Sequence, residues 1–240
     1  MRVYFVRHGQ AGTRTAYDAL SSVGKQQSRL LGEYFAVQKI QFAAACSGTL
    51  QRQRETSVEV AEAYERAGLE FPTIVAVPGW DEFDLDAVYR SLAPVLRDND
   101  EAFRREHEAM LAEIEAAGED GAARVHRRWT PCDLKVVQAW VSGQYPCEGE
   151  SWEQFRERVV AQRYALPGNS DDNLIVFTSA TPIGVWSALA MDIIDARAMR
   201  LAGVLLNSSF TLLEVRGDEF RLHCLNATPH LWNPELRTAR

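Results

Sequence analysis

The sequence predicts an α/β fold, a three-layer α/β/α sandwich with a mainly parallel mixed sheet and a helical insertion. From Val3 to Val77, short β-branched and aromatic segments alternate with amphipathic helical segments. This order of strand and helix is typical of a sheet whose neighbouring strands run parallel. From Leu85 to Gly149 the pattern changes to helical segments rich in Ala, Glu and Arg, which we interpret as the insertion.

The length and composition predict one domain over residues 1–240. With 240 residues, 46% of them hydrophobic, the chain can bury one substantial core. The helical insertion, at about 85–149, is then an addition to that domain. It could serve as a lid over an active site or as extra packing beside the sheet, and the sequence does not decide between the two.

Individual elements follow from local patterns. Strands are expected at Val3–Val6, Phe42–Cys46, Thr73–Val77 and Asn173–Thr178, and a hairpin at Ser209–Val215 with Glu219–Leu225. Helices are expected at Ser22–Ala36, Gln51–Ala67, Asp100–Ala117, Glu150–Ala165 and Ile183–Ile194. The expected apolar face of the second helix carries Val58, Ala61 and Tyr64. The segment from Ser179 to Pro182 is expected to be a loop of small residues.

The charge and the cysteines exclude several classes of function. A net charge of -7 argues against a general affinity for nucleic acid or for an anionic membrane, because both need a basic surface. No apolar run approaches the ~20 residues that cross a bilayer, and Met1 to Val6 lacks the features of a signal peptide, so we expect a cytoplasmic protein. The scattered cysteines predict reduced thiols, with no metal and no cofactor. The sequence leaves association into a homo-oligomer open.

The tetrapeptide Arg7-His8-Gly9-Gln10, directly after the first predicted strand, has the chemistry of a phosphate site. Arginine presents a fork of donors that matches phosphoryl oxygens, and glycine lets the backbone approach a ligand closely. A neutral imidazole is a competent nucleophile toward phosphorus. The motif therefore indicates phosphoryl transfer through His8.

Further segments resemble the motifs of the histidine phosphatase superfamily, the phosphoglycerate-mutase-like proteins, in the order in which that family has them. The resemblance extends from residue 2 to about residue 231. It is closest to a subgroup with RHGQ at the start, a Tyr-Asp pair like Tyr17-Asp18, and a TSxx segment, here Thr178-Ser179, in place of the second histidine. The matching segments are Leu20–Ser28 (LTxxGxxQA), Ser47–Thr56 (SSxLxRxxxT), Gly149–Ser151 with Arg158 (GES and its downstream arginine) and Asn226–Leu231 (NxxxHL).

The resemblance implies a role for each matching position. His8 would be the nucleophile that becomes phosphohistidine, and Arg7 and Arg52 would clamp the phosphoryl oxygens. Gln10 and Ser179 would complete the phosphate site. Two nearby guanidinium groups favour a neutral imidazole, which is the state that an attacking nitrogen requires.

A leaving alkoxide needs a proton, so the site requires a carboxylic acid across the pocket from His8. The segment Trp80–Asp84 follows the third predicted strand, where the family has its acid. We assign the role to Glu82 by resemblance to the family's LxE pattern. Burial beside a phosphate would keep this carboxyl group protonated. Asp81 and Asp84 are the rivals.

One position departs from the family pattern, because Ser179 stands where the family has a second histidine. Serine donates one hydrogen bond but carries no charge.

Taken together, the motifs predict a phosphatase that acts on a small phosphorylated metabolite. The alternatives are a phosphoglycerate-mutase-type phosphotransferase and a weakly active or non-catalytic member that binds a phosphorylated ligand. The remaining histidines with a conceivable role are expected to be structural or at the surface: His107, His126 and His230.

Overall fold

A computed structural model describes residues 1–240 except 13–17, 126–129, 168, 170, 195–196 and 240. The described chain forms two compact units, one of residues 1–82 with 158–240 and one of residues 83–157. The insertion predicted at about 85–149 falls inside the second unit. The two interpretations of this insertion, as a lid and as extra packing, both stay hypotheses. Among the described residues, no helix combines the length and the apolar character needed to cross a membrane.

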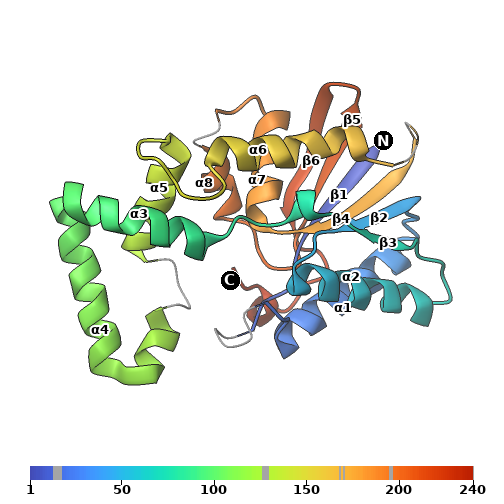
Figure 1. Ribbon diagram of the computed structural model, residues 1–240. Helices are drawn as coiled ribbons and strands as arrows, with labels where there is room; N and C mark the ends of the chain where they lie inside the picture. Colours follow the sequence, from blue (N-terminus) through green and yellow to red (C-terminus); the bar gives the residue numbers. More distant parts are fainter. Residues whose placement is uncertain (13–17, 126–129, 168, 170, 195–196, 240) are drawn as a thin grey trace. The chain divides into compact units, whose positions relative to one another are not determined.

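The first unit is built on one mixed sheet of six strands in the order β3-β2-β4-β1-β5-β6. The strands from β3 to β1 run parallel, whereas β5 lies antiparallel to β1 and forms a hairpin with β6. This arrangement confirms the predicted mainly parallel mixed sheet (Figure 1). The strands are β1 (Arg2–Arg7), β2 (Ala44–Ser47), β3 (Ile74–Ala76), β4 (Asn173–Thr178), β5 (Phe210–Arg216) and β6 (Glu219–Ala227).

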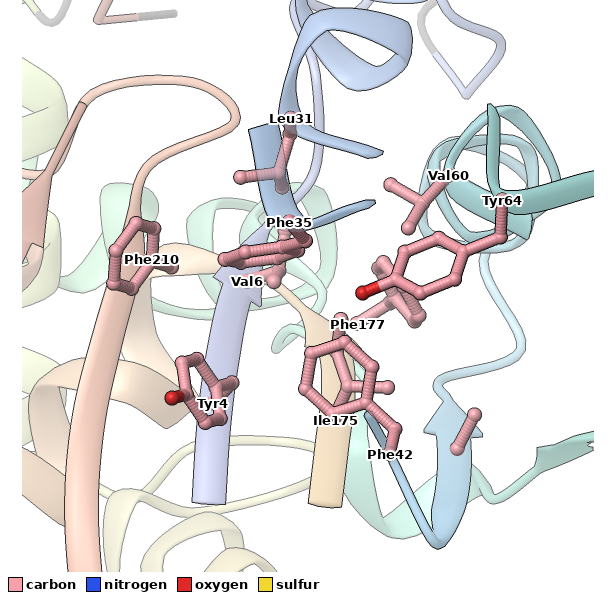
Figure 2. Close-up of a cluster of buried hydrophobic side chains, with 11 residues drawn as sticks. Tyr4, Val6, Leu31, Phe35, Phe42, Val60, Tyr64, Ile175, Phe177 and Phe210 are labelled. Carbon is pink, nitrogen blue, oxygen red and sulfur yellow. The ribbon is translucent and has the colours of Figure 1, made fainter. Parts of the chain in front are cut away.

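Helices cover both faces of this sheet, and the central strand β1 shows why. All its residues except Arg2 are buried, on both faces of the sheet, as expected of a strand inside the sheet. Tyr4 packs edge-on against Phe35 of α1 (Ser22–Val37), on the face that α1 shares with α2 (Gln51–Arg66). Figure 2 shows this cluster. Phe5 points the other way and packs on Trp186 of α7 (Ala180–Ala190), so the unit has three layers.

Two details of the first unit differ from the prediction. On α2, Val58 is exposed and Ala61 is only partly buried. Tyr64 is buried as predicted and shares its face with Val60, Ala63 and polar residues of the first turns. The segment after β4 is not a loop, because α7 begins at Ala180. Proline is tolerated in the first turn of a helix, where its missing N–H would have no intrahelical partner, so Pro182 does not delay the start.

The second unit is helical, as the composition of this segment predicts. It contains α3 (Leu85–Asn99), α4 (Glu101–Val125), α5 (Pro131–Ser142) and the first residues of α6 (Trp152–Ala161). Trp140 stacks on Phe83 and packs edge-on against Trp152, which gives the unit an aromatic core of its own. The first unit is completed by the short helix α8 (Ala198–Ala202).

Candidate active site

The predicted site residues lie on segments that leave the carboxyl ends of the four parallel strands. Arg7 ends β1 and His8 follows it, and Ser179 comes directly after β4. Arg52 lies in the first turn of α2, which begins four residues after β2, and Glu82 follows β3. Because these ends meet at one edge of the sheet, residues far apart in sequence converge there, as in other open α/β sheets.

Hydrogen bonds tie these strand ends together. The backbone N–H of His8 donates to the carbonyl of Thr178 at 2.9 Å, and that of Gly48 donates to Phe177 at 3.0 Å. The Thr178 hydroxyl donates to the carbonyl of Trp80 at 2.5 Å. The loops that carry the candidate site are therefore held to one another by two backbone hydrogen bonds and one side-chain hydroxyl.

The His8 imidazole is held in one tautomer. Its Nδ1 lies 2.7 Å from the carbonyl oxygen of Gly9, and a carbonyl only accepts, so Nδ1 carries the proton. The lone pair of the neutral ring is then on Nε2, where the Arg52 Nε–H donates to it at 3.2 Å. Burial lowers the pKa of His8 well below its ordinary value, and the charges of Arg52 and Arg7 lower this pKa further.

A carboxylate that the sequence prediction did not assign pairs with Arg52. Asp18 accepts a hydrogen bond from Arg52 Nη1 at 2.8 Å, and its second oxygen accepts the backbone N–H of Gln51 at 3.0 Å. The neighbouring segment is fixed to α2 as well, because Leu20 donates its N–H to Glu55 at 2.7 Å. Asp18 thus occupies the positive N-terminus of α2 and accepts a hydrogen bond at the edge of the Arg52 guanidinium.

Arg7 and Gln10 are connected to the predicted phosphate site less directly than Arg52 is. The Arg7 guanidinium is buried and donates to the carbonyl of Leu205, and its charge acts on His8. Gln10 uses its side-chain carbonyl to accept a hydrogen bond from Ser21, the N-cap of α1, at 2.8 Å. The phosphate contact predicted for Gln10 therefore stays a prediction.

Close packing explains the two glycines of the first motifs. A Cβ on Gly9 would lie 2.4 Å from the carbonyl oxygen of Gly24, and a Cβ on Gly24 would lie 2.1 Å from that of Gln10. Thr56, the last residue of the second motif, accepts the Gly9 N–H at 3.0 Å and donates to the carbonyl of Arg52 at 2.7 Å. Thr56 therefore joins the loop that carries His8 to the helix that carries Arg52.

The three candidate acids have different partners. Glu82 accepts the backbone N–H of Thr181 in the first turn of α7 at 3.1 Å, directly beyond the end of β4. Asp81 accepts from the backbone at 2.5 Å and from the hydroxyl of Thr49. Asp84 caps the N-terminus of α3. Asp84 and Glu82 thus each accept a first-turn N–H of a helix, and the role of Glu82 as the acid stays a prediction.

Arg158 holds the turn that precedes Glu82. Its Nη1 lies 3.1 Å from the carbonyl of Pro78, 3.2 Å from that of Gly79 and 3.2 Å from that of Asp81. The motif resemblance pointed to this arginine without giving it a task. These three carbonyl contacts indicate that Arg158 fixes the backbone of the turn, because a guanidinium can donate to several acceptors at once.

Ser179 has a partner that the sequence prediction missed. Its hydroxyl accepts a hydrogen bond from the Gln53 amide at 2.8 Å, and both residues are fully buried, with exposed fractions of 1% and 0%. The signal that could have revealed Gln53 is its place beside Arg52 on the buried face of α2. A long polar side chain on such a face needs a polar partner inside the protein.

Two of the other histidines, His230 and His107, have structural roles. His230 is buried, bonds to Ser208 at 2.7 Å, and has its pKa lowered by burial to about 3. His107 stacks on Phe103 in the second unit. Among the described residues, no three His, Cys, Asp or Glu side chains gather as a metal site requires. Two residues named in the sequence analysis, His126 and Tyr17, lie outside the described part of the chain.

We predict that His8 stays neutral where an ordinary imidazole becomes protonated, near pH 6.5. Its ring nitrogens should show the Nδ1–H tautomer in nitrogen-detected NMR spectra over this range. The unfolded chain does take up the proton, so the free energy of unfolding should fall as the pH drops below about 6.5. Arg52→Met should raise the pKa of His8, because Arg52 lowers this pKa more than Arg7 does.

Arg54→Met is the matched control for this titration, because Arg54 lies two residues away on α2 and is exposed. It should leave the titration of His8 unchanged. An imidazole that titrates normally in the unaltered protein would contradict the electrostatic description of the site.

Comparison with known proteins agrees with this architecture. The family model of the histidine phosphatase superfamily (branch 1) matches residues 3–139 and 130–228. No protein with a curated description gives a significant match.

Solved structures with the same fold include phosphatases. A mycobacterial glucosyl-3-phosphoglycerate phosphatase in complex with inorganic phosphate is 22% identical, with a TM-score of 0.59, and the match covers 95% of this chain and 98% of that one. A variant of phosphoserine phosphatase from Entamoeba histolytica in complex with phosphoserine is 14% identical, with a TM-score of 0.57 and coverage of 96% and 98%. YhfR from Bacillus stearothermophilus is 16% identical, with a TM-score of 0.61 and the same coverage. At these identities the structures show a shared fold. The family match over most of the sequence, together with a histidine and an arginine paired at the carboxyl edge of the sheet, places the chain in the histidine phosphatase superfamily.

Proposed function

We propose that this protein is a phosphomonoesterase that hydrolyses a small phosphorylated metabolite through a phosphohistidine at His8. The observation that carries the proposal is the lone pair of a buried, neutral imidazole held against the Arg52 guanidinium. This is the combination that nucleophilic attack on a phosphoryl dianion needs, because the nitrogen is unprotonated and the positive charge is already in place. No metal ion takes part in the proposed reaction.

The first step transfers the phosphoryl group to His8. The substrate displaces the Arg52 Nε–H from Nε2, and the guanidiniums of Arg7 and Arg52 bind the phosphoryl oxygens. The Nε2 lone pair attacks phosphorus, so an N–P bond forms and the ester P–O bond breaks. The alkoxide that leaves takes the proton of the Glu82 carboxyl group.

The second step returns the enzyme to its starting state. A water molecule attacks the phosphorus of the phosphohistidine and gives its proton to the Glu82 carboxylate. The N–P bond breaks, its electron pair returns to Nε2, and inorganic phosphate leaves. Glu82 is then protonated again, so one residue acts first as the acid and then as the base.

A mutase would share the first step and return the phosphoryl group to the substrate. It would have to keep water away from the phosphohistidine. No observation on the described residues favours this exclusion, so hydrolysis is the simpler outcome.

A weakly active protein that binds a phosphorylated ligand is the alternative with specific support. Ser179 supplies one neutral donor at a position where the family has an imidazole. Loss of one preorganised donor typically costs ~10²- to 10³-fold in rate. In addition, Asp18 neutralises Arg52 in the absence of substrate. Both features weaken the positive field that a phosphoryl dianion meets.

We predict that His8→Ala lowers the hydrolysis of p-nitrophenyl phosphate by on the order of 10³-fold or more, because it removes the nucleophile. His223→Ala is the matched control. His223 is a partly exposed histidine on β6 that pairs with Glu214, so its loss should leave the rate unchanged.

The site of phosphorylation separates this mechanism from others. Radiolabel from a phosphorylated substrate, quenched without acid, should remain on the protein and be absent from His8→Ala. Equal and negligible hydrolysis by both proteins would favour the ligand-binding alternative, and label on Ser179 would overturn the assignment of the nucleophile.

We predict that Asp18→Asn binds inorganic phosphate about two- to fivefold more tightly. The carboxylate is half-exposed and competes for Arg52, which is worth ~0.5–1 kcal/mol for a pair of this kind. Titration calorimetry measures the change. Glu62→Gln, which breaks an exposed pair with Arg66 on the same helix, is the control and should have no effect. Unchanged or weaker binding by Asp18→Asn would show that the two anions do not compete.

A further inference from the structure

The orientation of the buried Gln53 amide is fixed by its neighbours. One terminal atom of this amide lies 3.3 Å from the carbonyl oxygen of Trp80 and 2.8 Å from the hydroxyl oxygen of Ser179. A carbonyl oxygen only accepts hydrogen bonds, so this atom must be the nitrogen Nε2. It follows that the Ser179 oxygen receives an N–H from Gln53 and that the serine's own proton is left to donate elsewhere.

Another residue makes the capping hydrogen bond that Ser179 would normally make. Ser179 is the N-cap of α7, and a serine at that position normally accepts a backbone N–H of the first turn. Here its side chain makes no such bond, and the N–H of Thr181 donates to Glu82 instead. Ser179 is therefore released from capping by Glu82 and oriented by Gln53.

The serine also lies beside the nucleophile. The backbone N–H of His8 donates to the carbonyl of Thr178, the residue directly before Ser179. Gln53, in turn, directly follows Arg52, whose Nε–H is bonded to the His8 ring. Ser179 and Gln53 thus each directly follow a residue that is hydrogen-bonded to His8.

We propose that Gln53 is a positioning residue that makes Ser179 a hydrogen-bond donor to a phosphoryl oxygen bound at His8. The inference rests on the proposed function and deepens it. Because the amide nitrogen donates to one lone pair of the hydroxyl, the Ser179 proton points away from the amide and can be donated to the anion. The Gln53 amide thereby makes Ser179 donate rather than accept at the anion, at the position where the sequence departs from the family pattern.

The test is a double-mutant cycle between Gln53→Met and Ser179→Ala. Each single change should lower kcat/KM for p-nitrophenyl phosphate by about tenfold to a hundredfold, at or just below the usual cost of one preorganised donor. In the Ser179→Ala background, Gln53→Met should change the rate by less than about twofold, because its effect passes through the serine. Gln38→Met, an exposed glutamine at the end of α1, is the control and should retain full activity.

Two results would overturn the inference: full activity of Gln53→Met, or an equal loss from Gln53→Met with and without the Ser179 hydroxyl. If Gln53→Met does not fold, Gln53→Glu replaces it. A carboxylate would accept the Ser179 proton and turn it away from the anion, so this variant should also lose activity only when Ser179 is present.

The four proteins of the cycle are wild type, Gln53→Met, Ser179→Ala and the double variant. They are also titrated with inorganic phosphate, because binding requires no turnover. Dependence of phosphate affinity on Gln53 only when Ser179 is present supports the inference even if no substrate is hydrolysed. In that case the proposed hydrolysis fails while the positioning of Ser179 stands. Active wild-type protein with additive effects in both cycles gives the opposite result, in which the hydrolysis stands and the positioning is refuted.

Discussion

The contact between Arg52 Nε and His8 Nε2, at 3.2 Å, is the interaction on which the site depends. It requires an unprotonated ring nitrogen, and the burial of His8 between the charges of Arg52 and Arg7 supplies that state. On the other side of the ring, the carbonyl of Gly9 accepts the Nδ1 proton and so fixes the tautomer. The residues around this contact act mainly by holding its two partners. Thr56 fixes the loop to the helix, and the strand-end hydrogen bonds fix the loop to the sheet.

Carboxylates balance the positive charge at this edge of the sheet. Asp18 lies at the N-terminus of α2 and Glu82 at the N-terminus of α7. Helix N-termini attract anions, so in the absence of substrate each end is occupied by a side chain of the protein itself. In the proposed mechanism, an incoming phosphoryl group competes with Asp18 for Arg52, whereas Glu82 gives its proton to the leaving oxygen. The two carboxylates therefore have opposite consequences for catalysis.

Much of the fold could be predicted from local sequence. The continuous apolar run Asn173–Thr178 gave β4 with the correct bounds, and the hairpin of β5 and β6 followed from its turn residues. On the buried face of α2 only Tyr64 was assigned correctly, since hydrophobic periodicity assumes that buried residues are apolar. On this helix the buried positions of the first turns are Arg52, Gln53 and Thr56, which are polar because they build the site.

The site itself could be predicted only where a motif marked it. His8 and Arg52 belong to segments with a recognisable spacing, and the structure brings them into contact. Gln53 and Ser179 are 126 positions apart, and Glu82 and Thr181 are 99 apart, so no local pattern could reveal these pairs. Whether a polar side chain orients another one depends on the register of strands and helices in three dimensions.

A crystal structure of the protein with bound vanadate would test most directly whether His8 is the nucleophile. Vanadate adopts the trigonal bipyramidal geometry of a phosphoryl group during transfer. The predicted result is a bond from His8 Nε2 to vanadium, with Arg52 moved from the ring nitrogen to the equatorial oxygens and the Ser179 hydroxyl donating to one of them. Vanadate bound elsewhere, with Arg52 still on Nε2, would contradict the assignment.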